Sequence, residues 1–554
     1  MDQPQASVAK QAGAMGVATF FSRIGGLVRE QVFAFLFGAS DVADAFNIAF
    51  RIPNLLRDLF AEGAMSAAFV PQFTRALEKS KETAFRLLLA VLWTLLLGTG
   101  VLALIGIIFA PELVSLYASG YKAIFWKYEL TVSLTRWMFP FFPLVALAAV
   151  AMGALNAMGY FFLPAFAPVL FNLASIFAGL VLCPLVGRYT SLHPIYGMAV
   201  GVVLGGFLQF FVQWWKVRRL GLSIFEHGPR GQWSRPWQAP GVKAVLWLII
   251  PGTMGLAATQ LSILINSIFA TSKGSGAVSW LNYAFRLMQF PIGIFGVSLA
   301  AATLPRVTRL LKNKTGEASA QVVSSLRLCL VVNCAAAAGL MGVGLPLVQL
   351  LFQHGHFRYF DSMQTAEALW WYALGLPGYA AVKILVPLYY ALGTTRIPVI
   401  SSFAMVVVNT VLNYLMLEVW QMPFWALAAA TAVTSTLNAV FLYAWLGRLM
   451  PGMPTGRLLR GLGASLFLGA MVAGACTLST MTVSFAVLHM VKAGGLWRDL
   501  TGHIWWIWSA KLILAIGTST ALWLGVGSAM GLPEIRDGWD AITRKLHLRW
   551  FRRG

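Results

Sequence analysis

Long apolar segments recur from one end of the chain to the other, and short polar stretches separate them. A helix of about 20 apolar residues is long enough to cross the hydrocarbon core of a bilayer, so each segment predicts a transmembrane helix. The predicted spans, about fourteen in all, are residues 12–37, 42–74, 84–110, 131–157, 160–184, 194–215, 241–270, 279–305, 322–352, 365–392, 397–418, 423–447, 459–483 and 504–531. The pattern therefore predicts an all-α polytopic membrane protein.

Composition and charge support a membrane protein. Of the residues, 58% are hydrophobic and 11% are charged, whereas a soluble domain is about 25% charged. The formal net charge is +22, and Lys and Arg gather in every second gap between spans, for example at 75–81, 216–243 and 306–314. Cytoplasmic loops carry such an excess, so both termini are expected in the cytoplasm. This placement favours anionic membrane lipids as partners and argues against nucleic acid.

An internal repeat divides the chain into two lobes. Asn47-Ile-Ala-Phe-Arg51 returns as Asn282-Tyr-Ala-Phe-Arg286 after 235 residues, and two further matches keep the order at separations of 239 and 234 residues. Both copies start on the cytoplasmic side, which predicts two pseudo-symmetric six-helix lobes around a central cavity. The predicted domains are an N-terminal lobe (1–215), a basic cytoplasmic linker (216–243), a C-terminal lobe (244–455), two additional helices (456–531) and a basic cytoplasmic tail (532–554).

Five arginines lie inside three of the predicted spans, the first, second and eighth: Arg23, Arg29, Arg51, Arg57 and Arg286. A charge in the membrane is costly and usually faces a cavity, so these residues predict a cationic chamber. The planar guanidinium fork suits phosphate, and a diphosphate is the natural ligand. The alternative for each arginine is a side chain that snorkels to the interface or forms a structural ion pair.

Local features suggest how these charges are arranged. Helix breakers lie between the arginines of each pair, Gly25 and Gly26 in the first span and Pro53 in the second, and a kink there would turn both side chains toward one site. Asp44, Asn47 and Arg51 fall at i, i+3 and i+7, which is one polar stripe of a helix. Asp44 and Glu62 are expected to hold the arginines in position or to form part of a gate.

A second polar group lies in the eleventh and twelfth predicted spans. Asn409, Asn413 and Thr431 could ligate a monovalent cation, but only weakly without a carboxylate. Hydrogen bonding between helices is the favoured role of these side chains. The chain has no HExxH pattern and no GxxxxGK[ST] loop, so an intramembrane metalloprotease and an ATPase lack their motifs and no metal is expected.

Three segments carry a family resemblance: Phe21-Ser-Arg-Ile-Gly-Gly-Leu-Val-Arg-Glu30, Asp44-Ala-Phe-Asn-Ile-Ala-Phe-Arg-Ile-Pro-Asn-Leu-Leu-Arg57 and Val278-Ser-Trp-Leu-Asn-Tyr-Ala-Phe-Arg286. They resemble the MurJ/MviN family of lipid II flippases, within the multidrug/oligosaccharidyl-lipid/polysaccharide exporter superfamily. The resemblance implies alternating-access movement of lipid II, an undecaprenyl-diphosphate-linked peptidoglycan precursor, from the inner to the outer leaflet of the bacterial cytoplasmic (inner) membrane.

The resemblance also implies roles for individual positions. The family's cavity arginines fall on Arg23, Arg29, Arg57 and Arg286, and its acidic positions fall on Asp44 and Glu62. The last two helices would form a groove for the lipid tail. Phe285 and Gln289 stand where many relatives carry acidic residues beside the arginine of the eighth span, which weakens any gating or cation-coupling scheme that needs those acids.

We expect a transporter and not an enzyme, with no cofactor but a dependence on the membrane potential or on a monovalent cation. Expected partners are lipid II, anionic lipids and cell-wall synthesis proteins. A flippase for another polyprenyl-diphosphate-linked glycan is the nearest alternative, because the arginines recognise only the diphosphate. A cation-coupled drug antiporter of the same superfamily would need cavity carboxylates, and a non-transporting scaffold would not need buried arginines.

Overall fold

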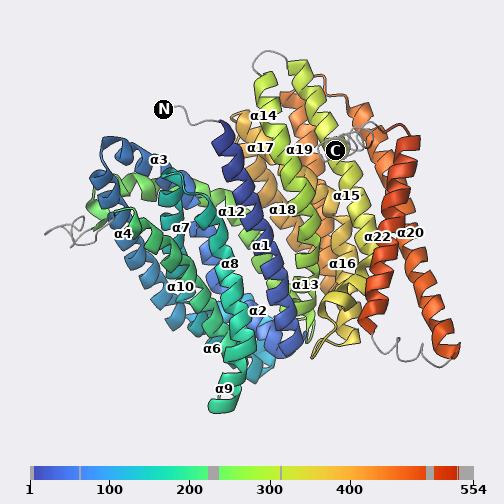
Figure 1. The fold of residues 1–554 in the computed structure, drawn as a ribbon, viewed down its shortest axis with the longest axis horizontal. Coiled ribbons are helices and arrows are strands. Elements are labelled where there is room, and N and C mark those ends of the chain that lie inside the picture. The colour runs from blue at the N-terminus through green and yellow to red at the C-terminus, as the bar shows by residue number, and fades with distance from the viewer. Residues whose placement is uncertain are drawn as a thin grey trace, which may run out of the picture. The chain divides into compact units, whose positions relative to one another are not determined.

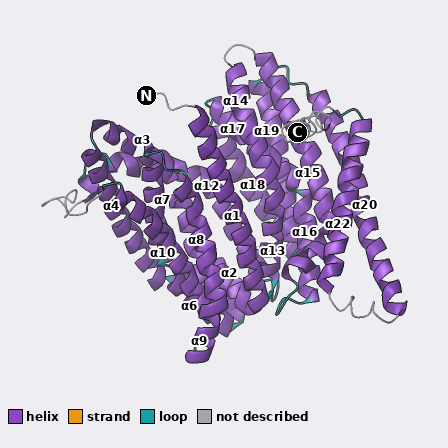
Figure 2. Cartoon of the chain, in the orientation of Figure 1, coloured by secondary structure: helices purple, strands orange, loops and turns teal. Residues whose placement is uncertain are grey.

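The computed structural model describes residues 5–61, 64–221, 236–311, 315–493, 504–532 and 535, and these ranges are helical with no strand among them (Figures 1 and 2). The chain forms two compact units. The first comprises residues 1–279 and 354–357, and the second comprises residues 280–353 and 358–554. Each unit is a bundle of packed helices.

The helices of the first unit range in length from 7 to 33 residues. They are α1 (Gln5–Phe37), α2 (Asp41–Ala61), α3 (Ala64–Lys79), α4 (Lys81–Ile108), α5 (Ala110–Tyr117), α6 (Phe125–Met138), α7 (Phe141–Ala157), α8 (Phe162–Phe177), α9 (Cys183–Tyr189), α10 (Ile195–Arg219) and α12 (Val242–Thr271), with short helical turns η1 (Ser119–Ala123), η2 (Ala178–Leu182) and η3 (Pro236–Gln238). Within this unit α1 packs along α8, and α12 packs on α2 and α3.

The junction of α1 and α2 depends on one glycine. Gly38 ends α1 with a φ of +60°, a left-handed conformation that glycine adopts without strain. A Cβ at Gly38 would lie 2.5 Å from the carbonyl oxygen of His356, so the close approach of that loop also requires glycine. The His356 N–H donates to the Phe35 carbonyl at 3.0 Å, which satisfies one free acceptor at the end of α1. Ser40 then starts α2 by accepting a hydrogen bond from the Ala43 N–H at 3.3 Å.

A stripe of glycines brings α10 against the α8–α9 segment. Gly197, Gly201 and Gly205 are four residues apart and lie on one face of α10. A Cβ at Gly201 would lie 2.3 Å from the Ala178 Cβ, and one at Gly205 would lie 2.5 Å from the Phe171 ring. Small residues at such spacing let helices approach closely in a membrane, where dispersion contacts drive their association.

The second unit contains the remaining helices. They are α13 (Ala277–Pro291), whose first residues belong to the first unit, and α14 (Val297–Leu311), α15 (Thr315–Phe352), α16 (Tyr359–Leu374), α17 (Leu376–Ala391), α18 (Arg396–Tyr414), α19 (Ala426–Leu449), α20 (Thr455–Ala493) and α22 (Ile504–Ala529), with π-helical turns η4 (Ile292–Gly296) and η5 (Leu415–Val419). The last two long helices, α20 and α22, lie side by side and both contact α15 (Figure 1).

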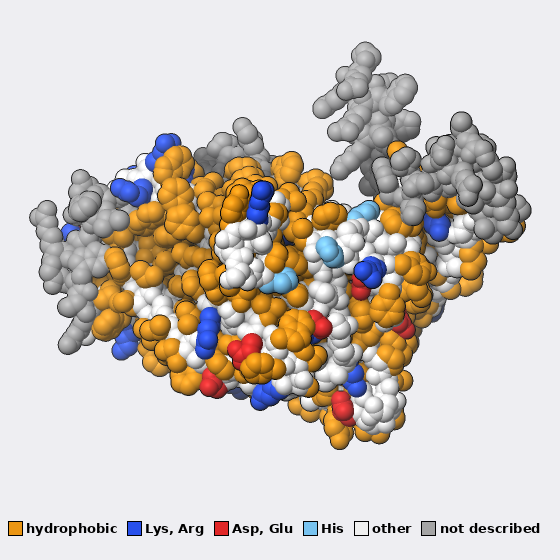
Figure 3. All heavy atoms as spheres, turned by 90° about the horizontal axis from the view of Figure 1, so that it is seen from below, with side chains coloured by type: hydrophobic (Ala, Val, Ile, Leu, Met, Phe, Trp, Pro, Cys, Tyr) orange, Lys and Arg blue, Asp and Glu red, His pale blue; other side chains and the backbone are white. Residues whose placement is uncertain are grey.

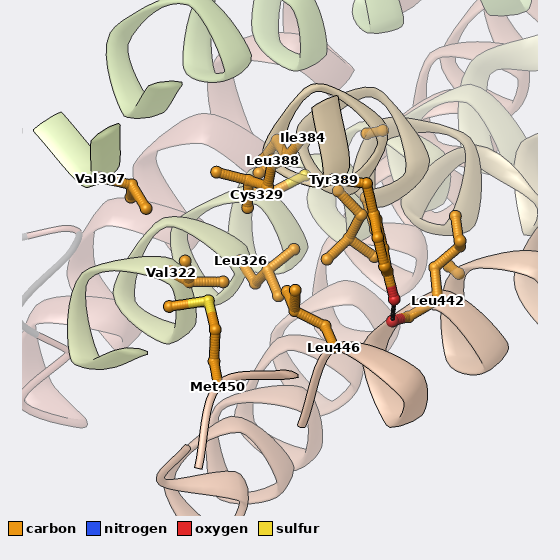
Figure 4. Close-up of a cluster of buried hydrophobic side chains, with 14 of the residues drawn as sticks. Val307, Val322, Leu326, Cys329, Ile384, Leu388, Tyr389, Leu442, Leu446 and Met450 are labelled. Carbon is orange, nitrogen blue, oxygen red and sulfur yellow. Dashed lines mark hydrogen bonds between the residues drawn. The ribbon is translucent and has the colours of Figure 1, made fainter. Parts of the chain in front are cut away.

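Figure 4 shows the core that joins α14, α15, α17 and α19. Leu326 of α15, Leu388 of α17 and Leu446 of α19 are buried together in this cluster. The hydroxyl of Tyr389 donates to the Leu442 carbonyl at 2.6 Å, so the one polar atom of that buried ring is satisfied. The cluster fixes the helix pairs of the second unit to each other.

The helices carry apolar faces suited to lipid. Val101, Leu104 and Ile108 of α4 are each more than half exposed, at 56%, 58% and 59%. Their spacing places them on one face of the helix. Apolar faces of this kind are unfavourable in water and match the hydrocarbon core of a bilayer. Figure 3 looks from below at the view of Figure 1, toward the ends of most helices, where charged groups lie among hydrophobic side chains.

Ten helical segments of the described chain are long and apolar enough to cross a membrane, or eleven if the α16–α17 pair, bent by 46°, is counted as one span. The all-α membrane fold is thus confirmed, but the predicted total of fourteen is not. The span expected at 42–74 is two helices, α2 and α3. The span expected at 365–392 bends where Gly375 precedes Leu376-Pro377, and a Cβ at Gly375 would lie 2.6 Å from the Ala432 Cα.

The compact units of the structure do not coincide with the two lobes predicted from the internal repeat. The helix α12 lies in the compact unit of the first lobe, because it packs on α2 and α3, whereas the repeat makes it the first helix of the C-terminal lobe. The domain boundaries drawn from the repeat stay a prediction. Most of the basic cytoplasmic tail, and residues 222–235 of the basic linker, lie outside the described residues.

We expect Gly201→Ala to destabilise the protein by about 1–3 kcal/mol, because the added methyl group overpacks the contact with Ala178. Gly98→Ala in α4 is the matched control, since a Cβ at Gly98 meets nothing within 4 Å. Thermal unfolding of the purified protein in detergent should show a lower Tm for Gly201→Ala only. Equal Tm values for both variants would contradict the close contact between α10 and η2.

Candidate functional site

The polar stripe predicted on α2 faces partners within the first unit. The Arg51 Nη1 donates to the Ser267 hydroxyl of α12 at 3.1 Å, and that hydroxyl donates to the Ile263 carbonyl at 2.7 Å. One turn earlier, the Asn47 Nδ2 donates to the Ser279 hydroxyl at 3.1 Å. These bonds join α2 to α12 and to the start of α13, so the stripe is an interhelical seam.

Arg57, near the end of α2, forms an ion pair with the next residue. Its Nε and Nη2 both donate to the Oδ1 of Asp58, at 3.0 and 2.7 Å. The other carboxylate oxygen accepts from the Asn54 amide and from the Gln260 amide of α12, each at 3.3 Å. Asp58 therefore fixes the direction of the Arg57 guanidinium group and links α2 to α12.

Arg29 on α1 has a similar arrangement. Its Nη2 donates to Glu30 Oε1 at 2.6 Å, and its guanidinium carbon lies 5.4 Å from the centre of the Phe171 ring of α8. The contact between α1 and α8 is close here, because a Cβ at Gly25 would lie 3.3 Å from the Asn172 Cβ. The helix continues through Gly25 and Gly26, and α2 likewise continues through Pro53. The two sites of expected kinking are thus positions within unbroken helices.

Asp44 lies in a buried network at the start of α2. Its carboxylate accepts from the Gly276 N–H at 2.8 Å and from the Ser279 N–H and hydroxyl at 2.9 and 2.7 Å, so it caps the first turn of α13. Lys127 of α6, which is 1% exposed, donates to Asp44 at 3.1 Å and to Asp41 at 2.6 Å. Asp44 thus bonds to a lysine and to a helix N-terminus, and not to the candidate arginines that we expected it to position.

The same network includes an aromatic ring. The Lys127 ammonium lies 4.1 Å from the centre of the Tyr121 ring, a cation–π contact. Burial, and then the nearby carboxylates of Asp44 and Asp41, hold the pKa of the Tyr121 phenol well above its usual value. Tyr121 therefore stays protonated across the physiological pH range and adds no charge to the network.

The other candidate residues lie in the second unit. Arg286 is exposed on α13, and the neighbouring Phe285 ring packs against Tyr372 with their centres 5.4 Å apart. In α18 the Asn413 amide donates to Asn409 Oδ1 at 3.2 Å, a bond within one helix. Thr431 donates to the Leu427 carbonyl of its own helix at 2.6 Å. The favoured interhelical role of Asn409, Asn413 and Thr431 stays a prediction. A hydrogen bond between α18 and α19 is made by Ser401, which donates to Asn438.

A comparison with known protein families decides the affiliation of the chain. The family model described as "Lipid II flippase MurJ" matches residues 33–494. The chain belongs to the MurJ family.

Individual relatives support the MurJ assignment. The chain is 36% identical over 428 residues to the lipid II flippase MurJ of Burkholderia cenocepacia, covering 77% of this chain and 81% of the relative. It is 33% identical to the probable lipid II flippase MurJ of Vibrio cholerae, over 77% and 80% of the two chains.

Solved structures share the fold. A lipid II flippase MurJ in an inward closed conformation aligns with a TM-score of 0.70 at 23% identity, covering 93% of this chain and 99% of that one. An inward-facing multidrug resistance MATE transporter aligns with a TM-score of 0.65 at 14% identity, covering 78% and 96%. At these identities the likeness shows the helical transporter fold alone.

The positions that the MurJ resemblance assigns are divided between the two units. Arg23, Arg29 and Arg57 lie in the first unit, with Arg23 exposed and the other two half-buried, whereas Arg286 lies in the second. Their convergence on one ligand therefore stays a prediction. Glu62, the second acidic position, lies outside the described residues.

The structure adds residues that the sequence reasoning missed. Asp58 follows Arg57 as Glu30 follows Arg29, so a repeated arginine–acid dipeptide was the available signal. Lys127 lies between the predicted spans 84–110 and 131–157, in a stretch that is otherwise poor in basic residues, and this marks it as unusual. Gln260 and Ser267 lie seven residues apart and so share one face of α12, a polar pattern in an apolar span.

We expect Lys127→Met to destabilise the first unit by about 3–5 kcal/mol, because it leaves two carboxylates without their buried counter-charge. Lys122→Met is the matched control, since Lys122 is exposed and nearby in the chain. Thermal unfolding of the purified variants in detergent measures the difference. If Lys127→Met unfolded at the same temperature as Lys122→Met, the buried network would not contribute to stability.

Proposed function

We propose that this protein is a lipid II flippase that works by alternating access between the two leaflets of the bacterial inner membrane. One observation carries the proposal: in a MurJ-family chain, the helices α1 and α2 hold half-buried arginines in bonds to carboxylates. A guanidinium group that binds a carboxylate at 2.6–2.7 Å can bind a phosphate with the same donors. The diphosphate of a polyprenyl-linked precursor presents such acceptors.

The arrangement also suits movement of a charged group through a membrane. A diphosphate in hydrocarbon would pay a large desolvation cost, and fixed arginines offset that cost. Arg51 and Arg57 belong to α2, and each is connected to α12, Arg51 through Ser267 and Arg57 through Asp58. The positions of these cations are therefore set by a helix pair and not by a mobile loop, which favours a preorganised binding site.

An antiporter of cationic drugs is less well supported. Such a transporter needs carboxylates that are available to a cation. In the first unit Glu30, Asp58 and Asp44 already bond to Arg29, Arg57 and Lys127 respectively. The charge balance of the described helices therefore favours an anionic ligand.

The remaining expectations complete the proposal. Both termini face the cytoplasm, and the basic cytoplasmic loops contact anionic lipids. Transport depends on the membrane potential or on a monovalent cation, for which Asn409, Asn413 and Thr431 are the candidate weak ligands. The polyprenyl tail lies along α20 and α22, and cell-wall synthesis proteins are the expected protein partners.

Complementation tests the function. A bacterium is depleted of its own lipid II flippase and supplied with this gene, and the outward movement of lipid II is followed. We expect rescue by the unaltered gene and loss of at least about tenfold in flipping for the Arg29→Ala, Arg57→Ala double variant, because charge-assisted hydrogen bonds to the diphosphate are removed. Arg86→Ala, which removes an exposed arginine paired with Glu82, should rescue fully.

Two outcomes would count against the proposal. Full rescue by the Arg29→Ala, Arg57→Ala variant would exclude these arginines from diphosphate binding. Failure of the unaltered gene to rescue lipid II movement, together with rescue of a strain that lacks a different polyprenyl-diphosphate glycan flippase, would transfer the function to that other glycan. Membrane levels of each variant, measured by immunoblot, separate loss of transport from loss of protein.

A further inference from the structure

The two oxygens of the Asp58 carboxylate have different partners. Oδ1 accepts both bonds from Arg57, at 3.0 and 2.7 Å, whereas Oδ2 accepts from Asn54 and Gln260 at 3.3 Å. The side chains of Arg57 and Asp58 are partly buried, with 26% and 18% of their surfaces exposed. Arg57 can therefore leave Oδ1 while the other two residues keep the carboxylate in place.

The pairing is unusual for a helix. Residues at i and i+1 point about 100° apart around a helix and do not normally face each other, and stabilising pairs are found at i+3 or i+4. Arg57 reaches around α2 to meet Asp58, although the commoner spacing does occur elsewhere, between Glu82 and Arg86. Arg29 and Glu30 repeat the adjacent arrangement on α1. Two candidate ligand-binding arginines thus have an acid beside them in the chain and bonded to them in the fold.

We propose that Asp58 is an internal counter-ion that occupies Arg57 when no ligand is bound and competes with the diphosphate for the same guanidinium donors. The inference rests on the proposed function and names Asp58 as a positioning residue that limits affinity and speeds release. A diphosphate must displace the carboxylate from Nε and Nη2 of Arg57 before it can use those two donors. When the diphosphate leaves, the carboxylate held by Asn54 and Gln260 returns to Arg57.

Competition of this kind answers a requirement of transport. A site that carries a ligand across a membrane must bind it well enough to load and weakly enough to unload. Arginines without counter-ions would hold a diphosphate tightly and would also leave unpaired cations in a low-dielectric region when empty. An attached carboxylate removes both problems, because it neutralises the empty site and replaces the departing anion.

The test compares Asp58→Asn, which removes the charge and keeps the shape, with wild type in the full-length protein. Binding of undecaprenyl diphosphate is measured in nanodiscs, with undecaprenol as the uncharged probe, and lipid II flipping is measured in proteoliposomes over a range of lipid II concentrations. We expect about tenfold tighter binding of undecaprenyl diphosphate, corresponding to loss of one competing charged group. Undecaprenol binding should not change. Both the half-saturating lipid II concentration and the maximal flipping rate should fall.

Two further variants make the result specific. Asp58→Glu restores the charge and should bring the affinity back toward the wild-type value. Glu82→Gln removes the carboxylate of an exposed arginine pair in α4 and should leave binding and flipping unchanged. Thermal unfolding of Asp58→Asn shows whether the variant is folded. Gln260→Leu removes a hydrogen bond to Oδ2 but keeps the charge of Asp58. This variant should tighten binding less than Asp58→Asn does.

The inference and the proposed function fail in different ways. Unchanged or weaker binding of undecaprenyl diphosphate by folded Asp58→Asn, in a protein whose wild type flips lipid II, would overturn the counter-ion role alone. Wild-type protein that binds undecaprenyl diphosphate but does not move lipid II would overturn the proposed function, and tighter binding by Asp58→Asn would still support the counter-ion. Equal tightening by Glu82→Gln would show a general charge effect and would also overturn the inference.

Discussion

Compensation of charge inside the membrane is the constraint on which this structure depends. A cation in a low-dielectric region costs several kcal/mol unless it is bonded to acceptors, so its partners must be supplied by the fold. In the first unit Arg29, Arg57 and Lys127 each bond to a carboxylate, and Arg51 bonds to a hydroxyl. The helices α6 and α12 are thereby held at fixed positions beside α2.

The helix α2 is the centre of this arrangement. Its first turn contacts Lys127 of α6 and the start of α13 through Asp44, and its later turns reach α12 through Arg51 and Asp58. Side chains that would bind an anionic ligand therefore also hold the helices together. A change in the charge at one of these positions is expected to affect both packing and binding, which is why variants must be paired with measurements of stability.

Apolar packing also positions the helices near the candidate arginines, and it depends on small residues that allow close approach. Glycines at 197, 201 and 205 let α10 approach η2 and α8, and α8 in turn carries the Phe171 ring beside Arg29 and the Asn172 amide beside Gly25. The Asn172 amide donates to the Ser22 carbonyl at 2.9 Å, so it adds a polar bond between α8 and α1. The environment of the α1 arginine is thus set by residues more than a hundred positions away in the chain.

The sequence by itself determined the membrane class, the approximate helix positions, the polar stripe of α2 and the family, because apolar length, helical periodicity and local motifs are properties of neighbouring residues. It also identified arginines suited to a diphosphate. Only the tertiary structure decided which acid each cation meets: Asp44 bonds to Lys127 and caps α13, Arg57 bonds to Asp58, and Gln260 of α12 fixes that carboxylate. Lys127, the start of α13 and Gln260 lie far from α2 in the chain, and their meeting with α2 depends on how the helices pack, which no local pattern records.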